Sequence, residues 1–199
     1  MRLILASGSR YRRDMLTRLR LPFTCISPDI DESPRSNETP AALAMRLAEE
    51  KARKIMTLHP DCIVIGSDQV ATYEGKIIGK PGSHEAAVKQ LLSLSGKQVN
   101  FHSALCVMNA TTTLRQDVIT HCHFRTLSNT EIDNYVKLEP SYDTAGSAKA
   151  EGLGITLMQS MRSDDPSAII GLPLIALSNM LRELGVNPLH EHHNSVTQA

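Results

Sequence analysis

A short apolar run near the start of the chain leads directly into a turn and then into a helical pattern, and this order constrains the fold more than any other feature. Residues 2–6 are typical of a buried strand, and Ser7-Gly8-Ser9 is typical of a turn. Ser9 can cap a helix whose apolar positions are Tyr11, Met15, Leu16 and Leu19. A strand followed at once by a helix indicates the α/β class, because the helix can cover the sheet to which the strand belongs.

The rest of the chain continues this alternation and adds hairpins in its middle part. The pattern predicts strands at 23–27, 62–66, 98–108, 114–124 and 155–161, a hairpin over 70–78, and helices at 40–58, 83–94, 128–139 and 173–184. Helices can cover parallel strands while hairpins add antiparallel ones, so we expect a mixed β-sheet flanked by helices. Residues 1–189 should form a single domain, with a flexible tail at 190–199.

Composition excludes several classes of function. The chain has 21 basic and 21 acidic residues, and this balance argues against a dedicated nucleic-acid-binding domain. Aromatic residues make up only 4% and Trp is absent, so a stacking platform for single-stranded nucleic acid is not expected. No apolar stretch is long enough for a secretory signal or a membrane span. Four widely spaced cysteines without a CxxC pair indicate reduced thiols, and we expect a cytoplasmic protein.

Basic residues are nevertheless concentrated in the first turn and helix. Arg10, Arg12 and Arg13 follow Ser7-Gly8-Ser9 directly. A helix N-terminus presents free backbone N–H groups, and hydroxyl groups add further donors. The guanidinium of one arginine can bind two phosphate oxygens at once. The pattern favours a phosphate site, although a plain capped helix with a solvated basic face has the same residues.

Two lysines strengthen the case for a polyphosphate. Lys51 falls near the centre of the apolar stripe of the 40–58 helix, where it must extend to solvent, pair with an acid or point into a cleft. Lys80 lies in the loop "GKP" just after the predicted hairpin.

Acidic residues offer a base and a metal site. Asp68 follows the predicted 62–66 strand, and ligands bind at the carboxyl ends of strands in open α/β sheets. The loop "DIDE" adds Asp31 and Glu32. A turn-forming Asp and a solvated acidic loop remain the alternatives, but together these oxygens suit Mg²⁺ with substrate phosphate. His121 and His123 share a strand face without a second ligand pair of zinc-site spacing, so we expect no zinc there.

The segments "LILASGSRYRRDML", "DESPR", "LAEEKA", "IGSDQV", "GKP", "AEGLGI" and "IIGLPL" occur in an order that resembles the Maf family of nucleotide pyrophosphatases, from Leu3 to about Pro188. The resemblance implies an elongated, two-lobed α/β fold around a central cleft, similar to that of inosine triphosphatases. It also implies hydrolysis of a nucleoside triphosphate to monophosphate and diphosphate, a divalent cation (Mg²⁺ or Mn²⁺) and a homodimer.

Matching motif positions implies a role for each site residue. Asp68 corresponds to the proton acceptor, and Glu32 assists the metal or the water, so the metal ligands are Glu32 and Asp68. The residues implied to hold the triphosphate are Ser7, Arg12, Arg13, Lys51 and Lys80.

Three further positions bear on the base. Tyr11, Gln69 and Glu151 resemble the branch of the family that acts on 7-methyl-GTP, although that branch usually has Trp at the position of Tyr11. N7-methylguanine is cationic, so an aromatic face attracts it, and a carboxylate can accept hydrogen bonds from its N1–H and amino groups. Packing of Tyr11 in the helix stripe is the competing interpretation.

Two alternatives remain open from the sequence. The same reaction could take place on dTTP, UTP or CTP. The chain could also be a non-catalytic, nucleotide-binding regulator of septum formation, because the family name carries that association.

Overall fold

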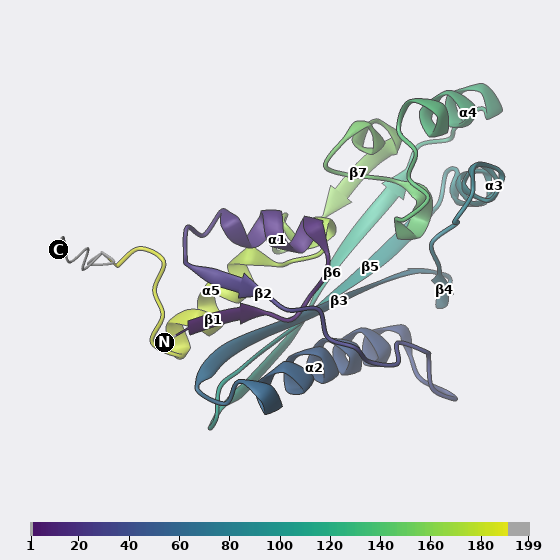
Figure 1. Ribbon diagram of the computed structural model, residues 1–199. Coiled ribbons are helices and arrows are strands. Elements are labelled where there is room, and N and C mark those ends of the chain that lie inside the picture. Colours follow the sequence, from purple (N-terminus) through teal and green to yellow (C-terminus); the bar gives the residue numbers. More distant parts are fainter. Residues whose placement is uncertain (1, 191–199) are drawn as a thin grey trace.

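The computed structural model describes residues 2–190 and shows one mixed sheet with helices on both faces (Figure 1). The described strands run in the order β2-β1-β3-β5-β6-β7, with β4 paired to β3 beside this path. Their bounds are β1 Arg2–Leu5, β2 Phe23–Cys25, β3 Cys62–Tyr73, β4 Lys76–Ile78, β5 Gln98–Met108, β6 Thr113–Phe124 and β7 Met158–Arg162. The helices are α1 Arg10–Thr17, α2 Pro40–Leu58, α3 His84–Leu94, α4 Asn129–Leu138 and α5 Leu174–Glu183. The predicted mixed α/β sheet is confirmed.

Strand β3 is the central element and is longer than predicted. Its first residues pair in parallel with β1, and from Val64 onward it pairs antiparallel with β5 as far as Thr72. Asp68 therefore lies in the middle of a strand, and the predicted strand end at Gly66 is wrong. β3 continues because β5 supplies hydrogen-bond partners after β1 has ended at Leu5. Asp68 thus stands just beyond the carboxyl end of the short parallel strand next to it.

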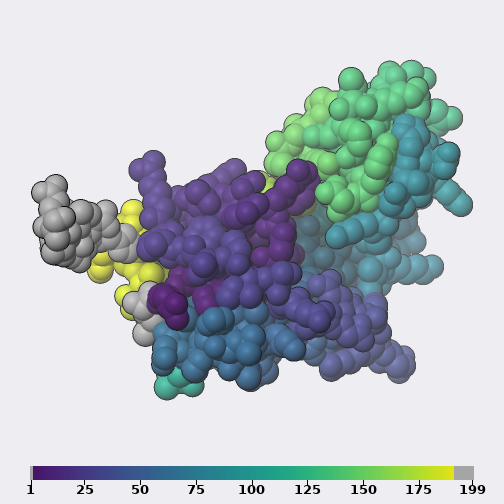
Figure 2. Space-filling view, in the orientation of Figure 1, coloured from purple at the N-terminus to yellow at the C-terminus, as the bar shows by residue number. Residues whose placement is uncertain are grey.

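The two faces of the sheet carry different helices. Helix α2 packs on one face, over residues that include Val64, Ala104 and Cys106. The other face carries two separate groups: α1 and α5 pack over a cluster that includes Leu105, and α3 and α4 pack over one that includes Phe124. Figure 2 shows these groups as two masses, purple and yellow on one side and teal and green on the other, and Figure 1 shows that the long strands join them.

Gly66 sets the distance between α2 and β3. A Cβ atom at this position would lie 2.0 Å from the carbonyl oxygen of Ala48 and 2.8 Å from the amide nitrogen of Ala52. The helix backbone therefore rests directly on the strand, which is possible only for glycine. Lys51 belongs to the same turn of α2, and its side chain reaches Asp68, two residues further along β3.

Two other boundaries also differ from the sequence pattern, and the first is the end of β2, which lies at Cys25 rather than at 27. Residues Leu153–Leu157 form a 3₁₀-helix, so β7 begins only at Met158 rather than at 155. The N–H of Ile155 donates to the carbonyl oxygen of Gly152 at 3.3 Å, so it is used within this turn and not in strand pairing. The predicted tail lies outside the described residues except for His190. No helix within residues 2–190 combines the length and apolarity that crossing a membrane requires.

Candidate active site

A cavity of about 570 Å³ opens between the first turn, β3 and the segments that lead into α5. This volume is in the range of about 300–1,000 Å³ that is typical of small-molecule sites. Nine of the ten residues proposed from the sequence line it: Ser7, Tyr11, Arg12, Glu32, Lys51, Asp68, Gln69, Lys80 and Glu151. The fold therefore brings together residues that are up to 144 positions apart (151 minus 7).

Lys51 lies between two carboxylates. Its Nζ is 2.7 Å from Oδ1 of Asp68 and 2.7 Å from Oε1 of Glu32. The side chains of Lys51 and Asp68 are only 7% and 10% exposed, whereas that of Glu32 is 58% exposed. Of the three expected arrangements for Lys51, the structure thus shows pairing with acids at the edge of a cleft.

Asp68 keeps one oxygen free. Lys51 binds Oδ1, and no described residue donates to Oδ2. The only fully buried side-chain atoms without a partner among the described residues are Oδ1 of Asp117 and Oγ1 of Thr120. Oδ2 of Asp68 is therefore in contact with solvent. Because Asp68 lines the cavity, this oxygen is available to a water molecule or a cation there.

Arg12 is held by the segment that precedes α5. Its Nε donates to the carbonyl oxygen of Gly171 at 3.0 Å, and no described residue pairs with its two terminal nitrogens. Burial lowers the pKa of the Arg12 guanidinium, while the negative charges of Asp68 and Glu32 act in the opposite direction. Arg12 therefore presents an oriented pair of N–H donors close to the two carboxylates.

Arg13 is the exception among the proposed phosphate-binding residues. It is exposed and does not line the cavity. One residue along a helix turns the side chain by about 100°, so Arg12 and Arg13 cannot face the same way. Burial raises the pKa of the Cys25 thiol in β2, and the positive charge of Arg13 acts in the opposite direction.

The first turn is ordered by its own hydroxyl groups. Oγ of Ser7 accepts from the N–H of Ser9 at 3.1 Å, and Oγ of Ser9 accepts from the N–H of Arg12 at 3.4 Å. Gly8 approaches Ser27 so closely that an added Cβ would lie 3.1 Å from its Oγ. Ser27 also lines the cavity and was not identified from the sequence, because a serine in a loop carries no distinguishing signal.

Gln69 is bound by backbone carbonyls. Its Nε2 lies 2.9 Å from Oγ of Ser103 and 3.0 and 3.1 Å from the carbonyl oxygens of Ala168 and Ile169. With Nε2 used in this way, Oε1 has no partner among the described residues, and it is not sealed from solvent. Gln69 therefore presents a hydrogen-bond acceptor to the cavity.

The segment that supplies these carbonyls is anchored by Asp165, which is 2% exposed. Its Oδ2 accepts from the N–H groups of Ile175 and Ala176 at 2.7 and 3.2 Å, and its Oδ1 accepts from Ser167. Asp165 thus caps α5 from ten residues upstream. Sequence reasoning missed it, because caps are normally sought next to the helix.

Tyr11 does not belong to the hydrophobic core. It is half-buried, and none of the three hydrophobic clusters includes it. The guanidinium of Arg10 lies 4.8 Å from the centre of its ring, and Nη2 of Arg10 donates to its hydroxyl group at 2.9 Å. The structure thus favours the reading of Tyr11 as a cavity residue over packing in the helix stripe.

The remaining proposed residues are at the rim. Lys80, which follows β4, and Glu151, which follows α4, are both exposed and line the cavity. Asp31 does not line the cavity, and its Oδ1 accepts from the N–H of Ser33.

The donor set suits a cation whose coordination is completed by oxygen atoms of the substrate. Within residues 2–190 no group of three or more His, Cys, Asp or Glu side chains could hold a metal ion by itself. Glu32 and Asp68 both approach the ammonium of Lys51, and Oδ2 of Asp68 is open. Mg²⁺ is commonly bound by one or two carboxylates together with phosphate oxygens, so these two residues fit it.

Comparison with known proteins gives a consistent picture. A family model described as "Maf-like protein" matches residues 2–184. A 7-methyl-GTP pyrophosphatase from Bordetella avium is 65% identical over 94% of this chain and 95% of its own length. The proteins of the same name from Bordetella pertussis and Burkholderia orbicola are 59% and 56% identical, over 96% and 91% of this chain and 96% and 89% of their own lengths. Among solved structures, a HAM1 protein from Coxiella burnetii has a TM-score of 0.48 and 17% identity over 93% of this chain and 98% of that chain, which is too distant to add to these assignments.

Proposed function

The chain belongs to the Maf family, and on this premise we propose that it hydrolyses 7-methyl-GTP to 7-methyl-GMP and diphosphate. Relatives that carry the name 7-methyl-GTP pyrophosphatase and are 56–65% identical over at least nine-tenths of the chain support the substrate. The alternative of a pyrimidine triphosphate has no comparable support.

One observation carries the chemistry: a carboxylate oxygen that is open to a cavity with four basic residues, Arg10, Arg12, Lys51 and Lys80, in its lining. Oδ2 of Asp68 faces the cavity while Oδ1 is neutralised by Lys51. We assign Asp68 as the acceptor of the proton from a water molecule that attacks the α-phosphorus. General-base catalysis of this kind contributes about 10²–10⁴-fold to a rate.

The basic residues would hold the triphosphate. Lys51 and Lys80 supply positive charge, and Arg12 supplies its two free terminal nitrogens. Positively charged donors that are in place before the reaction stabilise the charge that develops on the phosphate oxygens. Arg13, which lies outside the cavity lining, would contribute only at longer range.

Glu32 and Asp68 would hold the divalent cation, Mg²⁺ or Mn²⁺. When bound, this cation supplies charge neutralisation to the phosphate chain. Lys51 would then share the two carboxylates with the cation, so the ion pairs with Asp68 and Glu32 need not persist unchanged.

The base would be recognised at the other end of the cavity. Oε1 of Gln69 and the carboxylate of Glu151 are acceptors, and the Watson–Crick edge of guanine carries donors at N1 and at the amino group. The ring of Tyr11 offers a π-face, which attracts a cationic base more strongly than a neutral one.

The substrate is tested by diphosphate release from 7-methyl-GTP, GTP, dTTP, UTP and CTP in the presence of Mg²⁺. We expect the highest kcat/KM for 7-methyl-GTP. Preference for an unmethylated pyrimidine nucleotide would contradict the proposed base recognition. Binding of nucleotides without any release of diphosphate would instead favour the non-catalytic regulator.

We also propose that residues 1–189 unfold as one domain. We further propose that the protein is a homodimer and that it is located in the cytoplasm. Strands β3, β5 and β6 run through both lobes, which supports a single cooperative unit. The four free thiols suit a reducing compartment. A single calorimetric transition and a dimer mass by light scattering are expected; two transitions or a monomer mass would contradict these assignments.

A further inference from the structure

The aromatic face that the proposed function needs is already in contact with a cation from this chain. Arg10 stacks on the ring of Tyr11, with its guanidinium 4.8 Å from the ring centre. Its Nη2 also donates to the Tyr11 hydroxyl group at 2.9 Å, so the guanidinium is held at two points. Both residues line the cavity.

Guanidinium and N7-methylguanine have the same recognition chemistry. Each is a flat, delocalised cation, and each is attracted to the negative face of an aromatic ring. A cation on the ring must leave before another can stack there, and a cation that stays nearby repels the second one. An unmethylated guanine base is neutral, so it does not experience this repulsion.

We propose that Arg10 is a specificity-determining residue that competes with the methylated base for the face of Tyr11. The inference rests on the proposed function, because it concerns the base end of the same cavity. Arg10 is thus a fourth specificity residue beside Tyr11, Gln69 and Glu151. Its effect is to weaken the preference for the cationic base.

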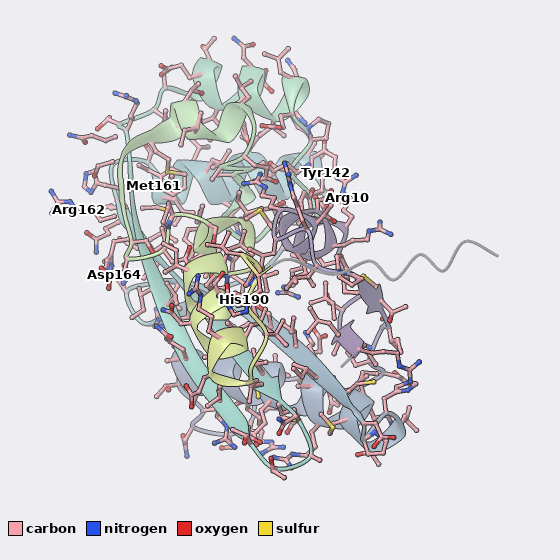
Figure 3. All side chains as sticks on the ribbon, turned by 90° about the vertical axis from the view of Figure 1, so that its left-hand side faces the viewer. Arg10, Tyr142, Met161, Arg162, Asp164 and His190 are labelled. Carbon is pink, nitrogen blue, oxygen red and sulfur yellow. The ribbon has the colours of Figure 1, made fainter. Side chains whose placement is uncertain are left out.

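Asp143 offers Arg10 a second position. It is exposed, it lines the same cavity, and it comes from the segment that follows α4 on the opposite lobe. The hydrogen bond with Tyr11 raises the pKa of Arg10, and the negative charge of Asp143 acts in the same direction, so the two charges are within interaction range. Figure 3 labels Arg10 and Tyr142, the neighbour of Asp143, in the same part of the molecule. Oδ1 of Asp143 already lies 3.5 Å from Nζ of Lys149, but the Asp143 side chain is 57% exposed and stays accessible to a second cation. When a base displaces Arg10 from Tyr11, the guanidinium can turn to Asp143.

The test compares Arg10→Gln with Arg18→Gln. Arg18 is an exposed arginine at the end of the same helix and does not line the cavity, so its replacement removes the same charge elsewhere. We expect Arg10→Gln to lower the KM for 7-methyl-GTP by about two- to fivefold, as a cation–π contact at an exposed site implies. The KM for GTP should change less, kcat should be unchanged, and Arg18→Gln should behave as the wild type.

A second variant separates the ring from the hydroxyl group. Tyr11→Phe keeps the aromatic face and removes the acceptor that holds Nη2 of Arg10. It should lower the KM in the same direction, and adding Arg10→Gln to it should bring little further change. The same comparison can be made independently of turnover by measuring the binding of 7-methyl-GMP without metal. The fluorescence of the methylated base reports this binding.

The outcomes distinguish this inference from the proposed function. Turnover of 7-methyl-GTP by the wild type with an unchanged or raised KM in Arg10→Gln would overturn the role of Arg10 alone. An equal fall of KM for GTP would overturn the charge argument. Absence of turnover and of 7-methyl-GMP binding in the wild type would overturn both proposals.

Discussion

Lys51 on α2 and Asp68 on β3 form a buried ion pair, with 2.7 Å between Nζ and Oδ1. Burial of a pair of charges is tolerated only when each compensates the other, because either one alone would lose its hydration without replacement. The pair therefore links the packing of the helix on the strand to the charge state of the cavity, and it orients the free oxygen of Asp68.

Replacement of Asp68 by Asn should abolish most of the proposed hydrolysis. The amide cannot accept the proton from water, so we expect kcat to fall roughly a hundredfold or more. Lys51 keeps Glu32 as a partner, so the protein should remain folded. The measurement is diphosphate release, with Asp61→Asn, an exposed acid just before β3, as the control. Full turnover by Asp68→Asn would remove Asp68 from the mechanism.

Replacement of Lys51 by Met should reduce both activity and stability. It leaves the carboxylate of Asp68 buried without its cation, and breaking such a pair costs on the order of 3 kcal/mol. Urea unfolding at pH 7 measures the loss, and Lys54→Met, at an exposed position one turn away, is the matched control. Equal unfolding free energies for the two variants would show that the pair is not important for stability.

Replacement of Gly66 by Ala should separate α2 from β3. The added Cβ would lie 2.0 Å from the carbonyl oxygen of Ala48, so the helix backbone must move. Overpacking of this kind costs about 1–3 kcal/mol, and the shift should also misplace Lys51. Gly79→Ala adds the same methyl group where no atom lies within 4 Å. A melting temperature that falls only for Gly66→Ala is expected, whereas equal effects would contradict the close contact.

Glu38 should make the stability depend on pH in the acid range. The hydrogen bond from Arg46 lowers the pKa of Glu38 from 4.5 to about 2, and the N–H of Arg35 contributes in the same direction. A carboxylate with a lowered pKa in the folded state stabilises the protein above about pH 4.5, and this contribution disappears as the pH falls to about 2.

Thermal unfolding of Glu38→Gln across this range tests the linkage. The melting temperature of the variant should be below that of the wild type at pH 6–7, and the two values should converge near pH 2. Glu183→Gln, which changes an exposed acid in α5, is the control. A difference that is independent of pH would mean that ionisation of Glu38 does not contribute.

The four thiols should differ strongly in reactivity. Burial raises the pKa of Cys106 and of Cys122 to about 12, and Cys62 is also buried, whereas Cys25 is exposed. Since the thiolate is the reactive form, iodoacetamide at pH 8 should modify Cys25 alone in the native protein and all four thiols after unfolding. Rapid modification of a second thiol in the native state would contradict the packing around β3, β5 or β6.

Local sequence patterns predicted most elements because helix caps, apolar periodicity and turn residues act over a few positions. The capping box of Ser128 and Glu131 begins α4 as expected, and Glu74-Gly75 forms the turn between β3 and β4. Where a boundary depended on a distant partner, the pattern was insufficient. The continuation of β3 through Asp68 depends on pairing with β5, and no residue in β3 itself encodes that partner.

The chemistry of the site was determined by the sequence alone to a considerable extent, because chemistry resides in side-chain type. A lysine on an apolar helix stripe needs an acid or a cleft wherever it is found, and Lys51 has both. What only the tertiary structure decided is how these side chains are oriented. Gln69 and Arg12 are held by the carbonyl oxygens of Ala168, Ile169 and Gly171, up to 159 residues away. A backbone carbonyl is the same in every residue, so no sequence pattern could have revealed which ones would bind them.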